Sequence, residues 1–441
     1  MRRPLAVLLL CPLALARVEP ALGRQLQTST LQANARGSPA ELSGVCDVSP
    51  WQTGRAGCSV LVDVPAGCAT AVSTSCPLVF FFHGAGGTNT AWSSQLGSFI
   101  HESGYAFIGV YPLGFEYGGA NYWNTGSQDG TTSDCSAAGS CSSDPDDLAF
   151  VQAIVARLQA LGAAGRRYAY GNSNGAALTN RIGVNGGMNF SGIVTSATQL
   201  TASPSTSGPL PYHYNYPSQG TGTRAIAVLA MHGSADNTIP IGGGPLFGGP
   251  FVLATALDSI GVWADAAGCA GTASVSSFPG SYFASGQVTT SVTQWEYACP
   301  DHTPVTYMQI ACAGHNGPST INGTSKWNTV FGFIAGVDAA CDASTTVPQS
   351  SQQARGPSDA CESQAVHGTE AGKPPRRATA NSGPTSARPT PSSAPNVAPI
   401  AKRQPRPRRA SESGVGLCVA SASRPGARMN KKTSMATVDA A

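Results

Sequence analysis

Short apolar segments alternate along this chain with longer segments of helical periodicity. Most of the apolar segments are bounded by Gly or Pro, which is typical of buried strands. The sequence predicts strands over residues 58–64, 78–82, 106–110, 167–170, 192–196, 224–231, 287–296 and 305–310. It predicts helices over residues 145–161, from 175 onward, over 251–267 and over 327–337. Strands that alternate with helices indicate an α/β fold, in which helices cover both faces of a mostly parallel sheet.

The chain begins with the pattern of a secretory signal peptide. Arg2 and Arg3 precede an apolar stretch over residues 5–16. We expect a signal peptide over residues 1–23, then a flexible leader over 24–44, in a protein that is extracellular. The alternative is a buried N-terminal helix. The apolar stretch is shorter than the ~18 residues that a membrane-spanning helix needs.

The last hundred residues differ in composition from the rest. Segment 342–441 is dominated by Ser, Pro, Ala, Thr and Arg and has little periodic apolar content. Such a segment buries too little surface to offset its chain entropy, so we expect it to be disordered. Its basic run over 402–409 could contact an acidic polymer or could simply be solvated. A single folded domain is expected over residues 45–341.

Charge is distributed unevenly around a net charge of +3. More than half of the 26 basic residues follow Cys341, whereas most of the 23 acidic residues lie in segment 45–341. A folded domain that is acidic and poor in lysine does not attract nucleic acid or anionic lipid. We therefore expect neither a nucleic acid nor a membrane as a partner.

The cysteines indicate an oxidising compartment. Ten of the 13 lie between Cys46 and Cys341, which is typical of a disulfide framework. The pairs that the sequence suggests are Cys68–Cys76, Cys135–Cys141 and Cys269–Cys299, although spacing alone leaves the connectivity open. A zinc site is not expected, because the chain has no CxxC pair.

The sharpest chemical signal is a G-x-S-x-G sequence over residues 171–175. A predicted strand runs into it and small residues that open a helix follow it, which is the setting of a nucleophile elbow. The glycines are needed there because neighbouring backbones come close in a tight turn. Ser173 is therefore the candidate nucleophile. The alternative is an ordinary Gly/Ser turn.

A serine hydroxyl needs a base to remove its proton and a carboxylate to orient that base. With the nucleophile on such an elbow the chain order is Ser, acid, His. His315 and Asp236 each follow a predicted strand, at the end where sites of parallel sheets lie. They are the candidate base and acid, although a surface role for His315 and a turn-stabilising role for Asp236 stay open. The candidates that fit less well are His213, His232, His302, Asp265 and Asp301.

Acyl transfer also needs donors for the oxyanion of its tetrahedral intermediate. The backbone N–H of Asn174, which follows the nucleophile, is the first candidate. The second comes from the glycine-rich loop over residues 83–87, with Ala85 or Gly84 as the donor. His83 is expected to have a structural role.

With these pieces in order, the chain resembles the secreted α/β-hydrolase family of polyhydroxybutyrate depolymerases and feruloyl or acetylxylan esterases. The matching stretches are 77–84, 111–114, 122–126, 146–150, 171–175, 232–240 and 314–315. The resemblance implies Ser173 as nucleophile, His315 as general base and acid, and Asp236 as its orienter. The chain departs from the family at Asn172, lacks the Trp-Pro that follows the histidine in bacterial members, and has no recognisable polymer-binding module.

The expected function is a secreted serine carboxylic-ester hydrolase without a metal or cofactor, acting as a monomer. A lone catalytic domain favours feruloyl esters of plant polysaccharide such as xylan. The alternatives are a polyhydroxybutyrate depolymerase, an acetylxylan esterase, or an inactive binding protein on a hydrolase fold. Trp123, Tyr122 and Tyr111 could stack on a feruloyl ring or a sugar, or could simply pack their loop.

Overall fold

The computed structural model describes ten stretches of the 441-residue chain. They are residues 30–46, 58–70, 72–102, 104–117, 119–124, 146–185, 188–203, 225–245, 252–300 and 303–345. The predicted signal peptide, the segment after Thr345, the Cys135–Cys141 pair, His213 and His302 lie outside the described residues. All the described residues belong to one structural unit.

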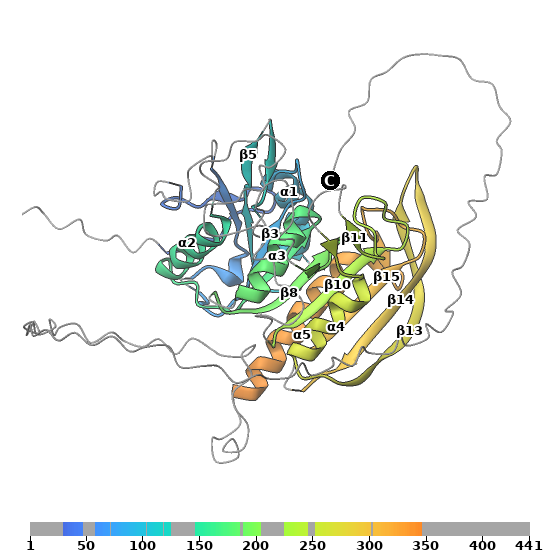
Figure 1. The fold of residues 1–441 in the computed structure, drawn as a ribbon. Helices are drawn as coiled ribbons and strands as arrows, with labels where there is room; N and C mark the ends of the chain where they lie inside the picture. The colour runs from blue at the N-terminus through green and yellow to red at the C-terminus, as the bar shows by residue number, and fades with distance from the viewer. Residues whose placement is uncertain are drawn as a thin grey trace, which may run out of the picture. The chain divides into compact units, whose positions relative to one another are not determined.

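A sheet of 12 strands forms the centre of the described part (Figure 1). Its strand order is β1-β2-β4-β3-β7-β8-β10-β15-β14-β13-β16-β17. The strands are β1 Ala40–Glu41, β2 Val60–Asp63, β3 Leu78–Phe82, β4 Ile108–Pro112, β7 Arg167–Asn172, β8 Phe190–Ser196, β10 Ala227–Gly233, β13 Ala270–Phe283, β14 Gln287–Ala298, β15 Val305–Ile310, β16 Thr320–Ile321 and β17 Thr324–Ser325. The run from β4 to β15 is parallel throughout. The carboxyl ends of these strands therefore meet at one edge, where a site can form.

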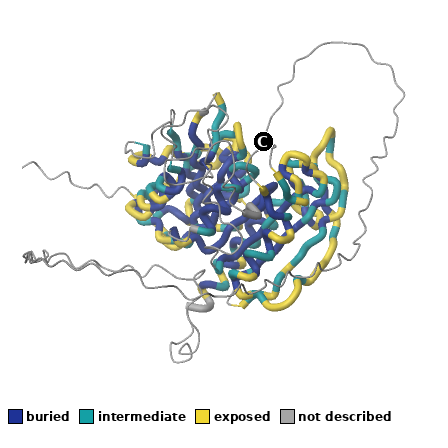
Figure 2. The backbone as a smooth tube through the Cα atoms, in the orientation of Figure 1, coloured by how far each residue is buried: buried dark blue, intermediate teal, exposed yellow. Residues whose placement is uncertain are grey.

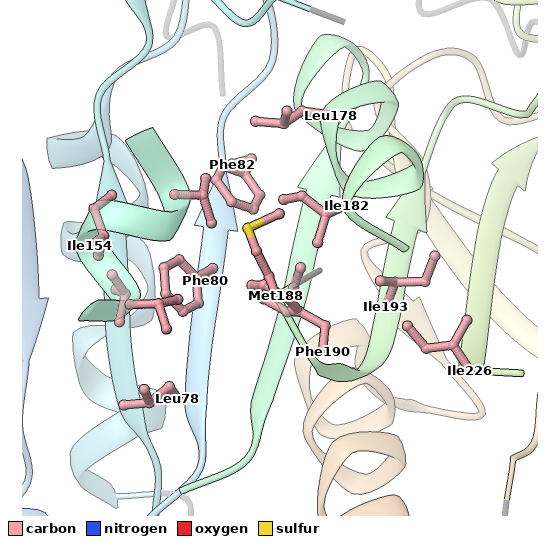
Figure 3. Close-up of a cluster of buried hydrophobic side chains, with 14 of the residues drawn as sticks. Leu78, Phe80, Phe82, Ile154, Leu178, Ile182, Met188, Phe190, Ile193 and Ile226 are labelled. Atoms are coloured by element: carbon pink, nitrogen blue, oxygen red, sulfur yellow. The ribbon is translucent and has the colours of Figure 1, made fainter. Parts of the chain in front are cut away.

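Helices cover both faces of the sheet, as the sequence predicts. They are α1 Asn89–Glu102, α2 Asp147–Ala160, α3 Asn174–Asn185, α4 Ala256–Ala266 and α5 Lys326–Thr345. Along β3, Phe80 and Phe82 point into the cluster formed with α2, α3 and α4, part of which Figure 3 shows. Val79 and Phe81 point into a second cluster with α1 and α5. This alternation on a strand that is buried on both faces explains its continuous apolar sequence.

Two smaller sheets follow the carboxyl ends of the parallel strands. A two-stranded ribbon pairs β5 Phe115–Tyr117 with β6 Ala120–Tyr122. A three-stranded sheet joins β9 Thr201–Ser203, β11 Gly244–Pro245 and β12 Val252–Leu253. A short 3-10 helix over Ala66–Cys68 follows β2, which runs antiparallel to β4, so this helix lies at the opposite edge. Strands β13 and β14 form a long hairpin at one side of the main sheet, and much of it is exposed (Figure 2).

The prediction of a flexible leader over residues 24–44 is wrong for residues 30–44, which the structure describes. Strand β1 pairs antiparallel with β2, and Leu31 and Leu42 are buried in the core. Residues 30–46 therefore belong to the folded domain, because their apolar side chains are buried there.

Two helix starts also differ from the expectation. Helix α2 begins at Asp147 and is capped by Asp146, whose carboxylate accepts from the Ala149 amide, so the predicted helix over 145–161 started too early. Helix α4 begins after Thr255, whose hydroxyl accepts from the Asp258 amide. The residues before this cap form β12, so the predicted helix over 251–267 started too early.

Disulfide bonds cross-link the described domain. Cys68–Cys76 and Cys269–Cys299 form as the sequence suggests, and Cys46 pairs with Cys58. Cys312 and Cys341 are disulfide-bonded as well. None of the described helices is both long enough and apolar enough to cross a membrane.

Candidate active site

Ser173 lies on a sharp turn between β7 and α3. Its φ of 53° falls in the left-handed region, which few residues other than glycine adopt without strain. A Cβ on Gly171 would lie 2.3 Å from the Gly175 carbonyl oxygen, and a Cβ on Gly175 would lie 2.3 Å from the Phe82 carbonyl oxygen. The two glycines are therefore required by close backbone contacts, and the predicted nucleophile elbow is present. With the strand order above, this turn makes the fold an α/β-hydrolase fold.

His315 reaches Ser173 from a loop that follows β15. Its Nε2 lies 2.8 Å from the Ser173 Oγ. The loop is held at both ends by the β13–β14 hairpin, because the Ala311 amide donates to the Ser291 carbonyl at 2.9 Å and the Ser319 amide to the Ser281 carbonyl at 2.7 Å. The ring of His315 is thereby fixed beside the hydroxyl.

Asp236 completes a hydrogen-bonded row with the histidine and the serine. It follows β10, and its Oδ2 lies 2.8 Å from the His315 Nδ1. Since a carboxylate only accepts, Nδ1 carries the proton and Nε2 is left to accept from the hydroxyl of Ser173. The other carboxylate oxygen accepts from the Thr238 and Ile239 amides at 2.8 and 2.9 Å.

A second histidine supports the same carboxylate. The His232 Nε2 lies 3.0 Å from the Asp236 Oδ2 and 2.9 Å from the Ile239 carbonyl oxygen, so it donates to both acceptors. Burial acts to raise the pKa of the Asp236 carboxyl. Hydrogen bonds from the two histidines and the Ile239 amide outweigh burial and hold this pKa well below its usual value. The sequence set His232 aside as the base and gave no signal for this supporting contact.

The glycine-rich loop over residues 83–87 lies beside the elbow. Within the described part of the chain, the Ala85 and Asn174 backbone amides donate to no other group. The Gly114 amide donates to the Nε2 of buried His83 at 3.0 Å, so the proton of this ring is on Nδ1. The His83 Nδ1 therefore donates to the Gly84 carbonyl at 2.8 Å. His83 therefore shapes the loop, which agrees with the structural role that the sequence favoured.

A cleft of about 480 Å³ opens at Ser173. It is lined by His83, Gly84, Ala85, Gly86, Gly87, Thr88, Ala91, Trp92, Gln95, Asn172, Ser173, His315 and Asn316. A volume of this size suits a small organic ligand. The sequence missed Ala91, Trp92 and Gln95 as cleft residues, because helix α1 that carries them was not predicted.

The three aromatic residues for which stacking on substrate was one of two alternatives do not line this cleft. Trp123 is 1% exposed, and Tyr111 is fully buried in β4. Tyr122 is half-buried and packs against Phe115. Trp123 and Tyr111 therefore pack inside the protein. The prediction that Trp123 stacks on substrate is wrong. No group of three or more metal-ligating side chains occurs among the described residues.

Comparisons with known proteins give only distant similarities. No protein-family profile matches the chain, and no curated protein has a similar sequence. An acetyl xylan esterase from Aspergillus awamori is 15% identical, with 67% of this chain and 99% of that chain covered and a TM-score of 0.37.

Two further solved structures are similar to a comparable degree. Thermogutta terrifontis esterase 2, phosphorylated by paraoxon, is 13% identical over 70% of this chain and 94% of its own, with a TM-score of 0.38. The poly(3-hydroxybutyrate) depolymerase LpqC from Bordetella parapertussis is 13% identical over 41% of this chain and 60% of its own, with a TM-score of 0.29.

Proposed function

We propose that this protein is a serine carboxylic-ester hydrolase. The observation that carries the proposal is the row from Ser173 through His315 to Asp236, with two contacts of 2.8 Å in the tautomer that base catalysis needs. Two backbone amides without a partner in the described part of the chain, those of Ala85 and Asn174, lie in segments that line or adjoin the same cleft. Acyl transfer requires such an activated nucleophile together with donors for the oxyanion.

The first half-reaction forms an acyl-enzyme. The Ser173 Oγ attacks the ester carbonyl carbon while its proton passes to the His315 Nε2, and the carbonyl oxygen becomes an oxyanion that accepts from the two amides. When the intermediate collapses, the bond to the alkoxy oxygen breaks and His315 gives its proton to the leaving alcohol. Asp236 stays ionised throughout and stabilises the imidazolium.

The second half-reaction restores the enzyme. A water attacks the acyl carbon and loses a proton to the His315 Nε2, and the oxyanion forms again at the same two amides. Collapse then breaks the bond to the Ser173 Oγ, which takes the proton back, and the carboxylic acid leaves. Every bond change uses groups of this chain and water, so the scheme needs no further reactant.

We propose feruloyl esters of plant polysaccharide as the substrate class, hydrolysed by a secreted enzyme. Trp92 is among the residues that line the cleft, and an aromatic side chain there supports an aromatic acyl group such as ferulate. The disulfide bonds support an extracellular location. Acetyl esters of xylan and hydroxybutyrate esters are the alternative substrates, and they would use the same catalytic groups.

Hydrolysis of methyl ferulate, p-nitrophenyl acetate and a hydroxybutyrate oligomer by the wild type and Ser173→Ala tests the proposal. We expect the variant to lose at least 10³-fold in kcat on every substrate that the wild type cleaves. Highest kcat/KM on the ferulate would support the aromatic acyl group, whereas preference for another substrate would move the assignment to that ester. Absence of all three activities in the wild type would favour the inactive binding protein.

A further inference from the structure

The segment over residues 121–124 contacts the catalytic frame rather than the cleft. We call it the strap. It comprises the end of β6 and the two residues that follow, and its Trp123 was expected to bind substrate. The hydrogen bonds described below join the strap to the oxyanion loop over residues 83–87, to helix α3, which follows the nucleophile, and to the start of helix α2.

The strap holds the oxyanion loop at three points. The Gly86 amide donates to the Asn121 carbonyl at 2.7 Å, and the Asn121 side-chain amide donates to the Gly87 carbonyl at 3.0 Å. The Trp123 Nε1 donates to the His83 carbonyl at 2.8 Å, and its ring packs 4.9 Å from the ring of His83. The loop amide of Ala85 is therefore fixed from both of its sides.

The same strap also holds the second oxyanion donor. The Trp123 amide donates to the Asn174 Oδ1 at 2.7 Å, and the Asn174 Nδ2 donates back to the Trp123 carbonyl at 3.1 Å. Asn174 is thus clamped through its side chain, while its own backbone N–H has no acceptor among the described residues.

The far end of the strap is anchored in two helices. The Asn124 amide donates to the carboxylate of Asp147 at the start of α2, and its carbonyl accepts from the Arg181 guanidinium of α3 at 2.8 Å. Asn124, Asp147 and Arg181 are all buried, so solvent does not compete for these contacts.

We propose that the strap is a positioning device that sets the separation of the two oxyanion donors, with Trp123 and Asn121 as its positioning residues. The inference rests on the proposed function, since it assigns a role in the same reaction. It also explains a tryptophan that cannot touch substrate: its indole N–H fixes one donor segment and its backbone fixes the other. Donors aimed at a developing charge act only when they are held at the correct distance.

The test compares Trp123→Phe with a matched variant, Trp263→Phe. Trp123→Phe keeps a ring but removes the N–H that donates to His83. Trp263 lies in α4 and is about as buried as Trp123, and within the described part of the chain no hydrogen bond or ring contact joins it to the strap. Loss of a whole oxyanion donor costs about 10²–10³ in kcat, so we expect a displaced donor to cost about tenfold, with KM within about twofold. Trp263→Phe should keep the kcat of the wild type.

A second variant keeps the test decisive if Trp123→Phe does not fold. Asn121 is only half-buried, so Asn121→Ala removes one strap contact with little risk to the core. Both strap variants should bind an aryl trifluoromethyl ketone, whose adduct on Ser173 carries an oxyanion, more weakly by the same factor as kcat falls. A purely structural role would lower the melting temperature without this parallel.

Three results would overturn the inference. The first is a kcat of Asn121→Ala and Trp123→Phe that equals the wild type. The second is an equal loss of kcat in Trp263→Phe. The third is a ketone affinity that stays constant while kcat falls. All three presuppose that the wild type hydrolyses an ester, so they are distinguishable from a failure of the proposed function, in which the wild type itself would be inactive.

Discussion

At the scale of single residues, the site depends on how Asp236 is kept ionised. The carboxylate is buried, and it accepts hydrogen bonds from two histidine rings and two backbone amides. Unpaired burial would favour its neutral form, which could not stabilise an imidazolium on His315. The donors around it therefore serve both the stability of the fold and the proposed chemistry.

Asp236→Asn should lower kcat by about 10³–10⁴, because an amide neither fixes the tautomer of His315 nor balances its charge. The wild type should also be more stable than the variant at neutral pH. In the folded protein the pKa of Asp236 lies below its usual value. The stability that this shift contributes is therefore complete above the usual carboxyl pKa of ~3.9 and is lost as pH falls below it.

Urea unfolding of both proteins at neutral pH and near pH 3 measures this difference. Its size should shrink at the lower pH. Asp265→Asn, on α4, controls for the loss of one negative charge. A difference in unfolding free energy that stays constant or grows on acidification would refute the assigned electrostatics of Asp236.

The sequence named the three candidate residues that the structure brings together, but not the contacts that support them. Ser173 stands in a recognisable motif, and chain order together with strand ends selects Asp236 and His315. His232 lies in β10, and it can support Asp236 because the turn after this strand brings the carboxylate, four positions later, back to the histidine ring. The burial of Trp123 depends on packing against the distant loop of His83. Neither contact has a local sequence signal.

At the scale of elements, the β13–β14 hairpin positions the loop that carries His315. Its strands pair over most of their length and extend beyond the end of β15, where Val292 is paired with Ile310. The Thr290 hydroxyl donates to the Ala311 carbonyl at 2.6 Å, and the Ser281 and Thr320 hydroxyls lie 2.7 Å apart. The hairpin is therefore a support for His315, although much of its surface faces solvent.

Ser281→Ala should destabilise the protein by about 1–3 kcal/mol, since it removes a buried hydroxyl and leaves the Thr320 and Gln287 side chains without that partner. Ser277→Ala, in the same strand but exposed, should change stability by less than about 0.5 kcal/mol. Thermal and urea unfolding of the two variants measure the contrast. Equal effects would mean that the hairpin does not hold the histidine loop through Ser281.

Elements with a strong pattern were predicted well, and those without one were missed. Strands β3 and β15 match the predicted ranges residue for residue, because each is apolar and bounded by clear breakers. Helix α1 was missed because only Trp92, Leu96 and Ile100 mark its buried side among Ser and Gly. Strand β13 was missed because most of it is exposed on both faces, which removes the alternation that identifies a strand.

At the scale of the whole molecule, disulfide bonds close chain loops of different length in the described domain. Cys269–Cys299 closes a loop of 30 residues that contains the hairpin, whereas Cys68–Cys76 closes one of only 8. A longer loop loses more freedom in the unfolded chain when it is closed. The larger loop should therefore contribute more to stability.

Replacing both Cys269 and Cys299 by Ala should lower the free energy of unfolding by about 2–4 kcal/mol. The equivalent double variant of Cys68 and Cys76 should cost about 1 kcal/mol less. Urea unfolding of both double variants without reductant provides the comparison. A larger loss for the short loop would show that local strain or packing, rather than loop closure, dominates.

The overall architecture was predictable because alternating strand and helix patterns specify a parallel sheet with two covered faces. Domain limits were less predictable. Residues 30–44 look polar and irregular, yet Leu31 and Leu42 fill positions on the core and β1 extends the sheet. Two apolar residues within a polar stretch give too weak a pattern to distinguish a docked segment from a free one.

The proposed function requires that Ser173 carry the acyl group during ester hydrolysis. Rapid mixing with p-nitrophenyl acetate, followed by acid quenching and peptide mass spectrometry, tests it most directly. We predict a burst of p-nitrophenol of about one equivalent per enzyme and an acetyl group on Ser173, both absent in Ser173→Ala. An acetyl group on another residue, or turnover that persists unchanged in Ser173→Ala, would contradict the account.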